Sequence, residues 1–152
     1  MEELVRGVPV PLFDRLSLAG AASETRHQLL SAAQLEDSIG RSLFSLLNTR
    51  SRLGLSEFSS STGTTLDYGI PDISALSTVT SADLELLQST VGQAICHYET
   101  RLKDVSIKAL PAIKPGGGAL LLISGTVTID LKFRQLNFQL QLLQQQTRVE
   151  AP

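Results

Sequence analysis

The clearest hydrophobic pattern in the chain is a stripe of leucine and isoleucine residues that recurs at helical spacing from Leu35 to Leu47. Such a stripe is typical of an amphipathic helix that buries one face. Ser31 and Gln34 precede it at the spacing of a capping box, in which the two side chains satisfy free amides of the first turn. The sequence therefore predicts a helix over residues 32–49.

A second apolar stripe extends from Leu84 to Tyr98 and also has helical spacing. Thr80 or Ser81 can cap its first turn, so this stretch predicts a second helix. Between the two helices, residues 51–77 carry glycine, proline and a cluster of serine and threonine. This composition indicates a long loop, of the kind that is usually either functional or disordered.

The last third of the chain changes to a period of two, in which apolar and polar residues alternate. The alternation predicts strands over residues 105–109, 121–131 and 136–142, an interruption at 132–135, and a short fourth strand at 147–150. Helices followed by strands without intervening helices favour an antiparallel sheet. The predicted fold class is α+β, with two main helices packed on an antiparallel sheet of three to four strands.

The N-terminal part of the chain has no comparable pattern. Residues 12–16 can form a short N-terminal helix, which is too short to be stable unless it docks on another surface. We therefore expect residues 1–30 to be an N-terminal docking segment and residues 31–152 to form a single α+β domain. A chain of 152 residues, 42% of them hydrophobic, is long enough to bury one core.

The predicted strand at 136–142 is unusual because residues 135–147 contain neither a charge nor a proline. Natural edge strands usually carry lysine, proline or a bulge that prevents pairing with other chains. The strand is therefore either internal to the sheet or designed to pair with a strand of another chain. The second interpretation makes Gln139 and Gln141 candidate partner-binding residues.

Composition narrows the range of partners and compartments. The net charge is −2 and only 18% of the residues are charged, which disfavours nucleic acid as the main partner. The N-terminus lacks an apolar signal segment, and no uncharged apolar stretch is long enough to cross a bilayer. Cys96 is the single cysteine, which suits a reducing compartment. We expect a soluble, cytoplasmic protein without direct membrane insertion.

No group of residues has the spacing of a catalytic or metal site. Cys96 and His97 are neighbours in a predicted helix, so their side chains diverge. Asp67 and Asp72 flank a tight segment, where aspartate usually caps or turns the backbone. The glycines at 116–118 open no helix and precede no lysine–serine pair, unlike a phosphate-binding loop. We therefore expect no enzyme activity, no cofactor and no metal, and the sequence favours a binding or structural protein.

Charged residues follow both predicted helices. Arg50 comes directly after the first helix, and Glu99 and Arg101 come after the second. Arginine suits bidentate contacts with carboxylates across interfaces. Taken one at a time, these residues are better explained as solvated charges or as cations that stabilise a helix end.

Three short segments, taken in order, resemble a known family. Residues 12–16 read LFDRL, residues 46–50 read LLNTR and residues 66–72 read LDYGIPD. They are similar to the LxDRL, LLNTR and DYGxPD signatures of the type VI secretion baseplate component TssE, a family related to phage baseplate wedge proteins once labelled tail lysozyme. The resemblance covers nearly the whole chain, and the pair of LLNTR and DYGxPD is its most specific part.

The resemblance implies a cytoplasmic assembly protein without catalytic activity. Members of this family lie in the baseplate wedge beside TssF, TssG and TssK, where the contractile sheath begins. Their sheet is similar to the part of sheath subunits that exchanges strands with neighbours. They also carry a Glu-Pro-Arg motif that contacts the wedge core. The matching positions here are Glu99, Thr100 and Arg101, so the proline is replaced while both charges are present.

The second signature has two interpretations that stay open. Gly69 permits a positive φ and Pro71 fixes φ, while the aspartates can bond local amides. The motif either orders a long loop or contacts a partner directly. With the residues singled out above, the candidate partner-binding residues are Glu99, Arg101, Arg50, Tyr68, Asp67, Asp72, Gln139 and Gln141.

The leading hypothesis is a structural subunit that joins the baseplate wedge to the first sheath ring of a type VI secretion machine. One alternative is a regulatory anti-adaptor of the same fold, which would act as a free monomer on a response regulator. A less favoured alternative is a cell-wall glycan hydrolase. That activity requires two carboxylates, such as Asp67 or Asp72 with Glu99, to converge beside a groove for sugar.

Overall fold

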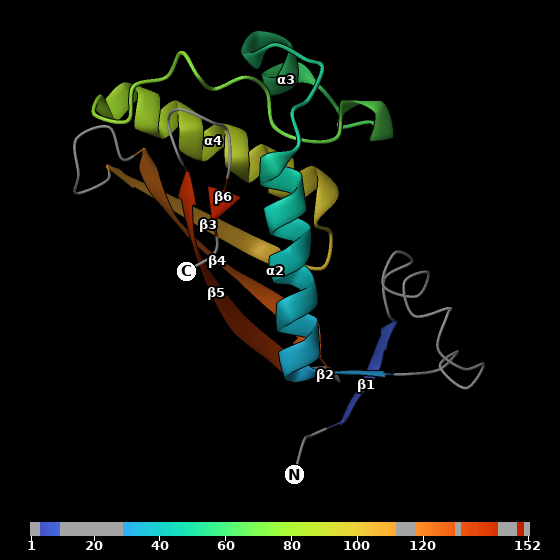
Figure 1. Cartoon of the computed structure of the whole chain (residues 1–152). Helices are drawn as coiled ribbons and strands as arrows, with labels where there is room; N and C mark the ends of the chain where they lie inside the picture. The colour runs from blue at the N-terminus through green and yellow to red at the C-terminus, as the bar shows by residue number, and fades with distance from the viewer. Residues whose placement is uncertain (1–3, 10–28, 112–117, 130–131, 143–148, 151–152) are drawn as a thin grey trace.

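The computed structural model describes residues 4–9, 29–111, 118–129, 132–142 and 149–150. Two long helices, α2 (Ala32–Asn48) and α4 (Ser81–Tyr98), cover one face of an antiparallel sheet (Figure 1). Both helices were predicted from the apolar stripes, and the stripe of α2, including Leu43, is buried against the sheet. The predicted α+β class is confirmed.

The two helices begin differently. The backbone N–H of Ser31 donates to Gln34 Oε1 at 2.9 Å and the N–H of Gln34 donates to Ser31 Oγ at 3.2 Å, so the predicted capping box is present. At α4, Thr80 is the N-cap but its side chain makes no capping bond. Asp83 instead accepts a hydrogen bond from the N–H of Ser77 at 3.0 Å, which fastens the preceding loop to the helix.

The sheet contains β3 (Lys103–Pro111), β4 (Ala119–Ile129), β5 (Lys132–Leu142) and β6 (Val149–Glu150), paired in that order. The predicted interruption at 132–135 is wrong. Lys132 lies opposite Ile129 and the pairing is continuous to Leu142, so these residues are part of β5. All four side chains are exposed, Phe133 included, so no alternation of apolar and polar residues marked this part of the strand.

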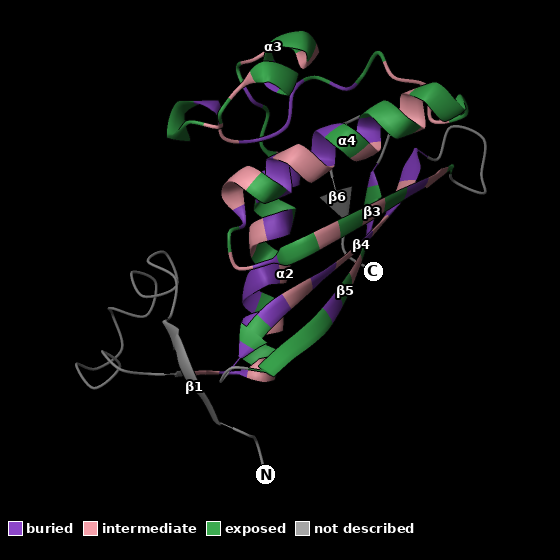
Figure 2. Ribbon diagram, turned by 180° about the vertical axis from the view of Figure 1, so that it is seen from behind, coloured by how far each residue is buried: buried purple, intermediate pink, exposed green. Residues whose placement is uncertain are grey.

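Side chains alternate between the two faces of the sheet, as the period of two predicts. On β4 the buried positions run from Ala119 to Ile129 at every second residue, and the positions between them are more exposed (Figure 2). The core therefore lies between this face and the two helices. Its large, fully buried side chains include Leu35, Ile39, Leu43, Leu46, Leu47, Phe58, Ile70, Ile95, Leu121 and Ile123.

Two regions contain elements that the sequence pattern does not predict. The segment between the long helices holds α3 (Leu55–Ser60) and a short 3-10 helix, η2 (Thr65–Asp67), so it is a structured connection. Near the N-terminus, β1 (Leu4–Pro9) pairs antiparallel with β2 (Leu29–Ser31). The short helix predicted at 12–16 lies outside the described residues.

Candidate functional site

The two signature segments lie against each other and form what we call the motif cluster, residues 49–52 and 64–72. Arg50 and Ile70 form a parallel bridge. The N–H of Ser51 donates to the carbonyl of Ile70 at 2.8 Å, and the N–H of Ile70 donates to the carbonyl of Thr49 at 2.9 Å. The end of α2 is thereby fastened to the segment that precedes α4.

Gly69 explains why the second signature contains glycine at this position. Its φ is 114°, a conformation that other residues rarely adopt. A Cβ atom here would lie 2.3 Å from the carbonyl oxygen of Thr49, which is backbone and cannot move aside. The close approach of the two segments therefore depends on a missing side chain.

Asp67 is the polar centre of the motif cluster. Its buried carboxylate accepts hydrogen bonds from Arg52 Nε at 2.8 Å and from the hydroxyl of Thr64. Its backbone carbonyl accepts from the hydroxyl of Ser51 at 2.8 Å. The hydrogen bond from Thr64, followed by that from Arg52, lowers the pKa of Asp67 below its ordinary value of 3.8.

Asp72 is placed more openly at the rim of the cluster. Its carboxylate lies 3.1 Å from Arg50 Nη1 in an exposed ion pair, and it accepts a hydrogen bond from the N–H of Ser74 at 3.0 Å. The bonds from Ser74, with a smaller contribution from Arg50, lower the pKa of Asp72. Asp72 thus pairs with Arg50 of the first signature, and Asp67 pairs with Arg52, two residues further along the chain.

Tyr68 fastens the cluster to α4. Its ring packs edge to face on the ring of Tyr98 with 5.2 Å between centroids, and the Tyr98 hydroxyl donates to the carbonyl of Thr64 at 3.0 Å. Burial, and to a lesser degree the nearby charge of Glu99, raises the pKa of Tyr68. Tyr68 and Tyr98 therefore anchor the motif cluster to α4.

Glu99 and Arg101 form a second polar site at the turn from α4 into β3. Arg101 Nε lies 2.7 Å from Glu99 Oε1 and Nη2 lies 2.6 Å from Oε2, a bidentate contact. The side chain of Glu99 is 5% exposed and that of Arg101 is 23% exposed. The guanidinium also donates to the hydroxyls of Ser38 and Ser42 on α2, both at 2.9 Å. This site joins both long helices to the start of the sheet.

Gln139 and Gln141 lie apart from both polar sites, on the outer face of β5. Among the described residues, only β6 pairs with the side of β5 that faces away from β4, and it does so at Gln141 and Leu142. We call the remainder of that side, along residues 132–140, the open edge of β5. Among the described residues, the strand is thus internal at its end and has a single strand partner along most of its length; its pairing with another chain stays a prediction.

Sequence reasoning missed four residues that complete these sites. Thr64 and Tyr98 hold the motif cluster, and Ser38 and Ser42 hold the guanidinium of Arg101. Only the two serines could have been found from the sequence, because their spacing of four residues places them on one face of α2. Their partner, more than fifty residues away in the chain, is fixed by the tertiary fold.

Two of the grooves on the described part of the molecule lie beside β5. The α2–β5 groove, of about 620 Å³, is lined by Gly40, Arg41, Phe44, Ser45 and residues 137–140. A second groove of about 440 Å³ lies on the outer face of the sheet around Lys108 and Asn137. Neither groove is lined by an acidic residue. Within the described ranges, no helix combines the length and the apolar character that a membrane span requires.

A comparison with models of known protein families identifies the family of this chain. Residues 33–133 match the model of the family described as baseplate wedge protein gp25. The match covers more than half of the chain, so the chain belongs to this baseplate wedge family. No curated protein matches the chain. Membership gives the protein a structural role in the baseplate of a contractile machine, and the predicted resemblance to baseplate components is confirmed.

Proposed function

We propose that this protein is the type VI baseplate subunit that joins the wedge complex to the first ring of the sheath. Its family supplies the baseplate role. The observation that carries the finer proposal is the open edge of β5. Residues 135–140 carry no charge, and among the described residues no strand pairs with their outer side, which suits pairing with another chain. A row of main-chain hydrogen bonds bears load without a large apolar patch.

The proposed partners are the wedge proteins TssF, TssG and TssK on one side and sheath subunits on the other, in the cytoplasm. The role needs no catalysis. Asp67, Asp72 and Glu99, the carboxylates that a glycan hydrolase would use, each bind an arginine of the same chain.

The polar sites have different parts in this proposal. Glu99 is buried by its own chain, so a contact with the wedge reaches the exposed rim of Arg101 while Glu99 positions the guanidinium. Arg50 and Asp72 are both half exposed and can exchange their mutual ion pair for partner contacts. Residues 1–30 act as the docking segment of the domain at 31–152.

Co-purification tests this function. The full chain is co-expressed with TssF, TssG, TssK and the sheath subunits, and the complexes are isolated through a tag on the chain. We expect Gln139→Lys with Gln141→Lys to reduce recovery of sheath subunits, because lysine on a strand edge opposes pairing. The control, Ala82→Lys with Ser89→Lys, adds the same charge at exposed positions of α4.

The outcomes separate the alternatives. Recovery of wedge and sheath subunits with the unmodified chain, and loss of sheath alone with the β5 variant, support the proposal. A chain that binds none of these components and purifies with a response regulator is an anti-adaptor. Release of sugar from purified cell wall would identify a hydrolase.

A further inference from the structure

Arg52 is held at one edge of its guanidinium and open at the other. Its Nε donates to Asp67 Oδ1 at 2.8 Å, and the side chain of Asp67 is 7% exposed, so this bond fixes the guanidinium against the motif cluster. The side chain of Arg52 is nevertheless 65% exposed. Among the described residues, no group accepts a hydrogen bond from its Nη1 or Nη2. These two nitrogens form a planar pair of donors that matches a carboxylate.

Arg101 shows how this fold treats an arginine that it uses entirely for itself. Its Nε and Nη2 bond the carboxylate of Glu99, its Nη1 donates to Ser38 and its Nη2 also donates to Ser42. Both terminal nitrogens are therefore occupied within the chain. Arg52 differs because a single internal bond positions it and its outward edge remains available.

An exposed leucine accompanies this arginine. Leu66 directly precedes Asp67 in η2 and is 77% exposed. A single exposed leucine needs no explanation by itself. Leu66 is informative because its neighbour in the chain is the residue that holds Arg52, so an apolar group and a directed cation are presented by one short element. Interfaces between proteins commonly combine an arginine with apolar contacts at their centre.

The charge around Arg52 is balanced within the chain. Asp67 pairs with Arg52, and Arg50 pairs with Asp72 in the same cluster. The hydrogen bonds from Thr64 and then Arg52 lower the pKa of Asp67, so its carboxylate stays charged at neutral pH. A balanced site exerts little long-range attraction on nucleic acid, which requires a surplus of cations. Such a site selects by the direction of its hydrogen bonds, which favours a carboxylate of a protein.

The position of Arg52 in the fold keeps this surface apart from β5. Arg52 lies in the stretch between α2 and α3, and α3 packs on α4. Figure 1 shows α3 on the side of α4 that faces away from the sheet. A protein that docks at Arg52 therefore approaches from the helix side of the molecule and leaves β5 accessible to another chain.

We propose that Arg52 and Leu66 form a docking surface for an aspartate or glutamate side chain of a wedge protein that has an apolar residue beside it. The partner's carboxylate accepts one N–H from Nη1 and one from Nη2 of Arg52, and the apolar residue packs on Leu66. Asp67 is a positioning residue, because its bond to Nε sets the direction of the outward edge. This inference rests on the proposed function and adds the chemistry by which the wedge is recognised.

Arg52→Gln tests the outward edge by itself. The Nε2 of glutamine occupies the place of arginine Nε, so the bond to Asp67 can still form while both terminal nitrogens are removed. The tagged full chain is immobilised and titrated with the purified complex of TssF, TssG and TssK. We expect Arg52→Gln to weaken binding by about tenfold or more. Arg52→Lys should also weaken it, because one ammonium cannot hold Asp67 and present a planar pair of donors.

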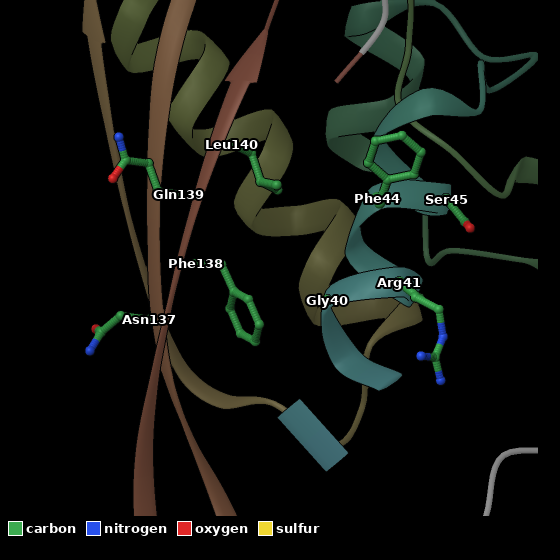
Figure 3. Close-up of a pocket in the computed structure, with 8 residues that line it drawn as sticks. All are labelled: Gly40, Arg41, Phe44, Ser45, Asn137, Phe138, Gln139 and Leu140. Atoms are coloured by element: carbon green, nitrogen blue, oxygen red, sulfur yellow. The ribbon is translucent and has the colours of Figure 1, made fainter. Parts of the chain in front are cut away.

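Arg41→Gln is the matched control. It removes the same group from another exposed arginine, on α2 beside the α2–β5 groove, where the side chain points away from β5 (Figure 3). This variant should bind the wedge complex as tightly as the unmodified chain. Urea unfolding of each variant shows whether its fold is intact, and we expect little change in the midpoint for Arg41→Gln.

Leu66→Ser tests the apolar half of the surface. Leu66 lies outside the core, so the substitution should leave the urea midpoint unchanged and weaken wedge binding by about threefold or more. Val79→Ser is its control, because Val79 is 84% exposed and lies in the loop before α4. The control should bind normally.

Several results would overturn this surface. They are wedge binding by Arg52→Gln and Arg52→Lys as tight as that of the unmodified chain, equal losses from Leu66→Ser and Val79→Ser, and a loss of sheath subunits but not of wedge proteins in Arg52→Gln. Binding of a fluorescein-labelled DNA oligonucleotide that Arg52→Gln abolishes would identify a phosphate ligand instead. If the unmodified chain binds no wedge protein, the proposed function itself fails, whereas undiminished binding by the variants refutes the docking surface alone.

Discussion

The motif cluster and the open edge of β5 use their polar groups in opposite ways. In the cluster, Asp67 accepts hydrogen bonds from three directions through its carboxylate and carbonyl, and Tyr68 is packed against α4. Along β5, no described strand pairs with the outer side of residues 132–140, and residues 137–140 line the α2–β5 groove. The buried polar groups of the first region are satisfied within the chain, and we propose that the second region is available to a partner.

In the proposed function, the residues that identify the family are not those that bind its partners. The signatures are recognisable because glycine, aspartate and arginine meet specific backbone demands, such as the φ of Gly69. The open edge of β5 has no comparable signature, since pairing through the backbone makes few demands on side chains. Substitutions of the buried groups should therefore affect stability in the first region, and substitutions of the strand should affect assembly in the second.

The largest loss of stability is expected from Arg101→Ala. It removes the bidentate partner of Glu99, whose carboxylate is buried, and leaves an unpaired charge in the interior. Removal of one member of a buried ion pair typically costs about 3–5 kcal/mol. Urea unfolding of the purified variant measures this loss of unfolding free energy.

A double-mutant cycle sharpens that measurement. Glu99→Ala combined with Arg101→Ala should be less destabilising than Arg101→Ala alone, because no buried charge then remains unpaired. Arg50→Ala is a suitable comparison, since Arg50 and its partner Asp72 are both half exposed and the loss should be much smaller. Equal losses from Arg101→Ala and Arg50→Ala would show that the Glu99–Arg101 pair is not a structural centre.

Gly69→Ala comes next in expected effect. The added Cβ would meet the backbone of Thr49, and the φ of 114° is an unfavourable backbone conformation for alanine. Strain of this kind costs about 1–3 kcal/mol, and here it also opens the bridge between Arg50 and Ile70. Hydrogen exchange should show faster exchange of the Ser51 and Ile70 amides. Gly54→Ala, whose added Cβ would meet only a flexible Glu57 oxygen at 3.8 Å, is the control.

The sequence predicts more of the fold than of the sites. Helical and strand periods locate α2, α4, β4 and the end of β5 because one face of each is buried. The first half of β5 was not predicted, because its side chains lie outside the core and do not alternate between apolar and polar residues. The clusters around Asp67 and Arg101 join residues distant in the chain, and no local pattern encodes such pairs.

A smaller, pH-dependent effect is expected at Asp67. Its folded-state pKa lies below the ordinary value of 3.8, so its charged form stabilises the fold at neutral pH, and this stabilisation disappears as the pH falls through the folded-state pKa. The difference in melting temperature between the protein and Asp67→Asn should be full above about pH 5 and shrink below pH 3.8. Asp37→Asn, on the exposed side of α2, controls for the change in net charge. A difference that does not vary with pH would assign the effect to shape instead of charge.

The smallest effect on stability, and the sharpest contrast with the motif cluster, is expected from Gln139→Lys with Gln141→Lys. Both side chains are exposed on the outer face of β5, where substitutions usually change the unfolding free energy by less than about 0.5 kcal/mol. The same variant should lose sheath subunits in co-purification, whereas Gly69→Ala should retain them whenever it is folded. If the two variants instead lost stability and assembly in parallel, the open edge of β5 would be a part of the folding core, and the division between a closed and an available region would not hold.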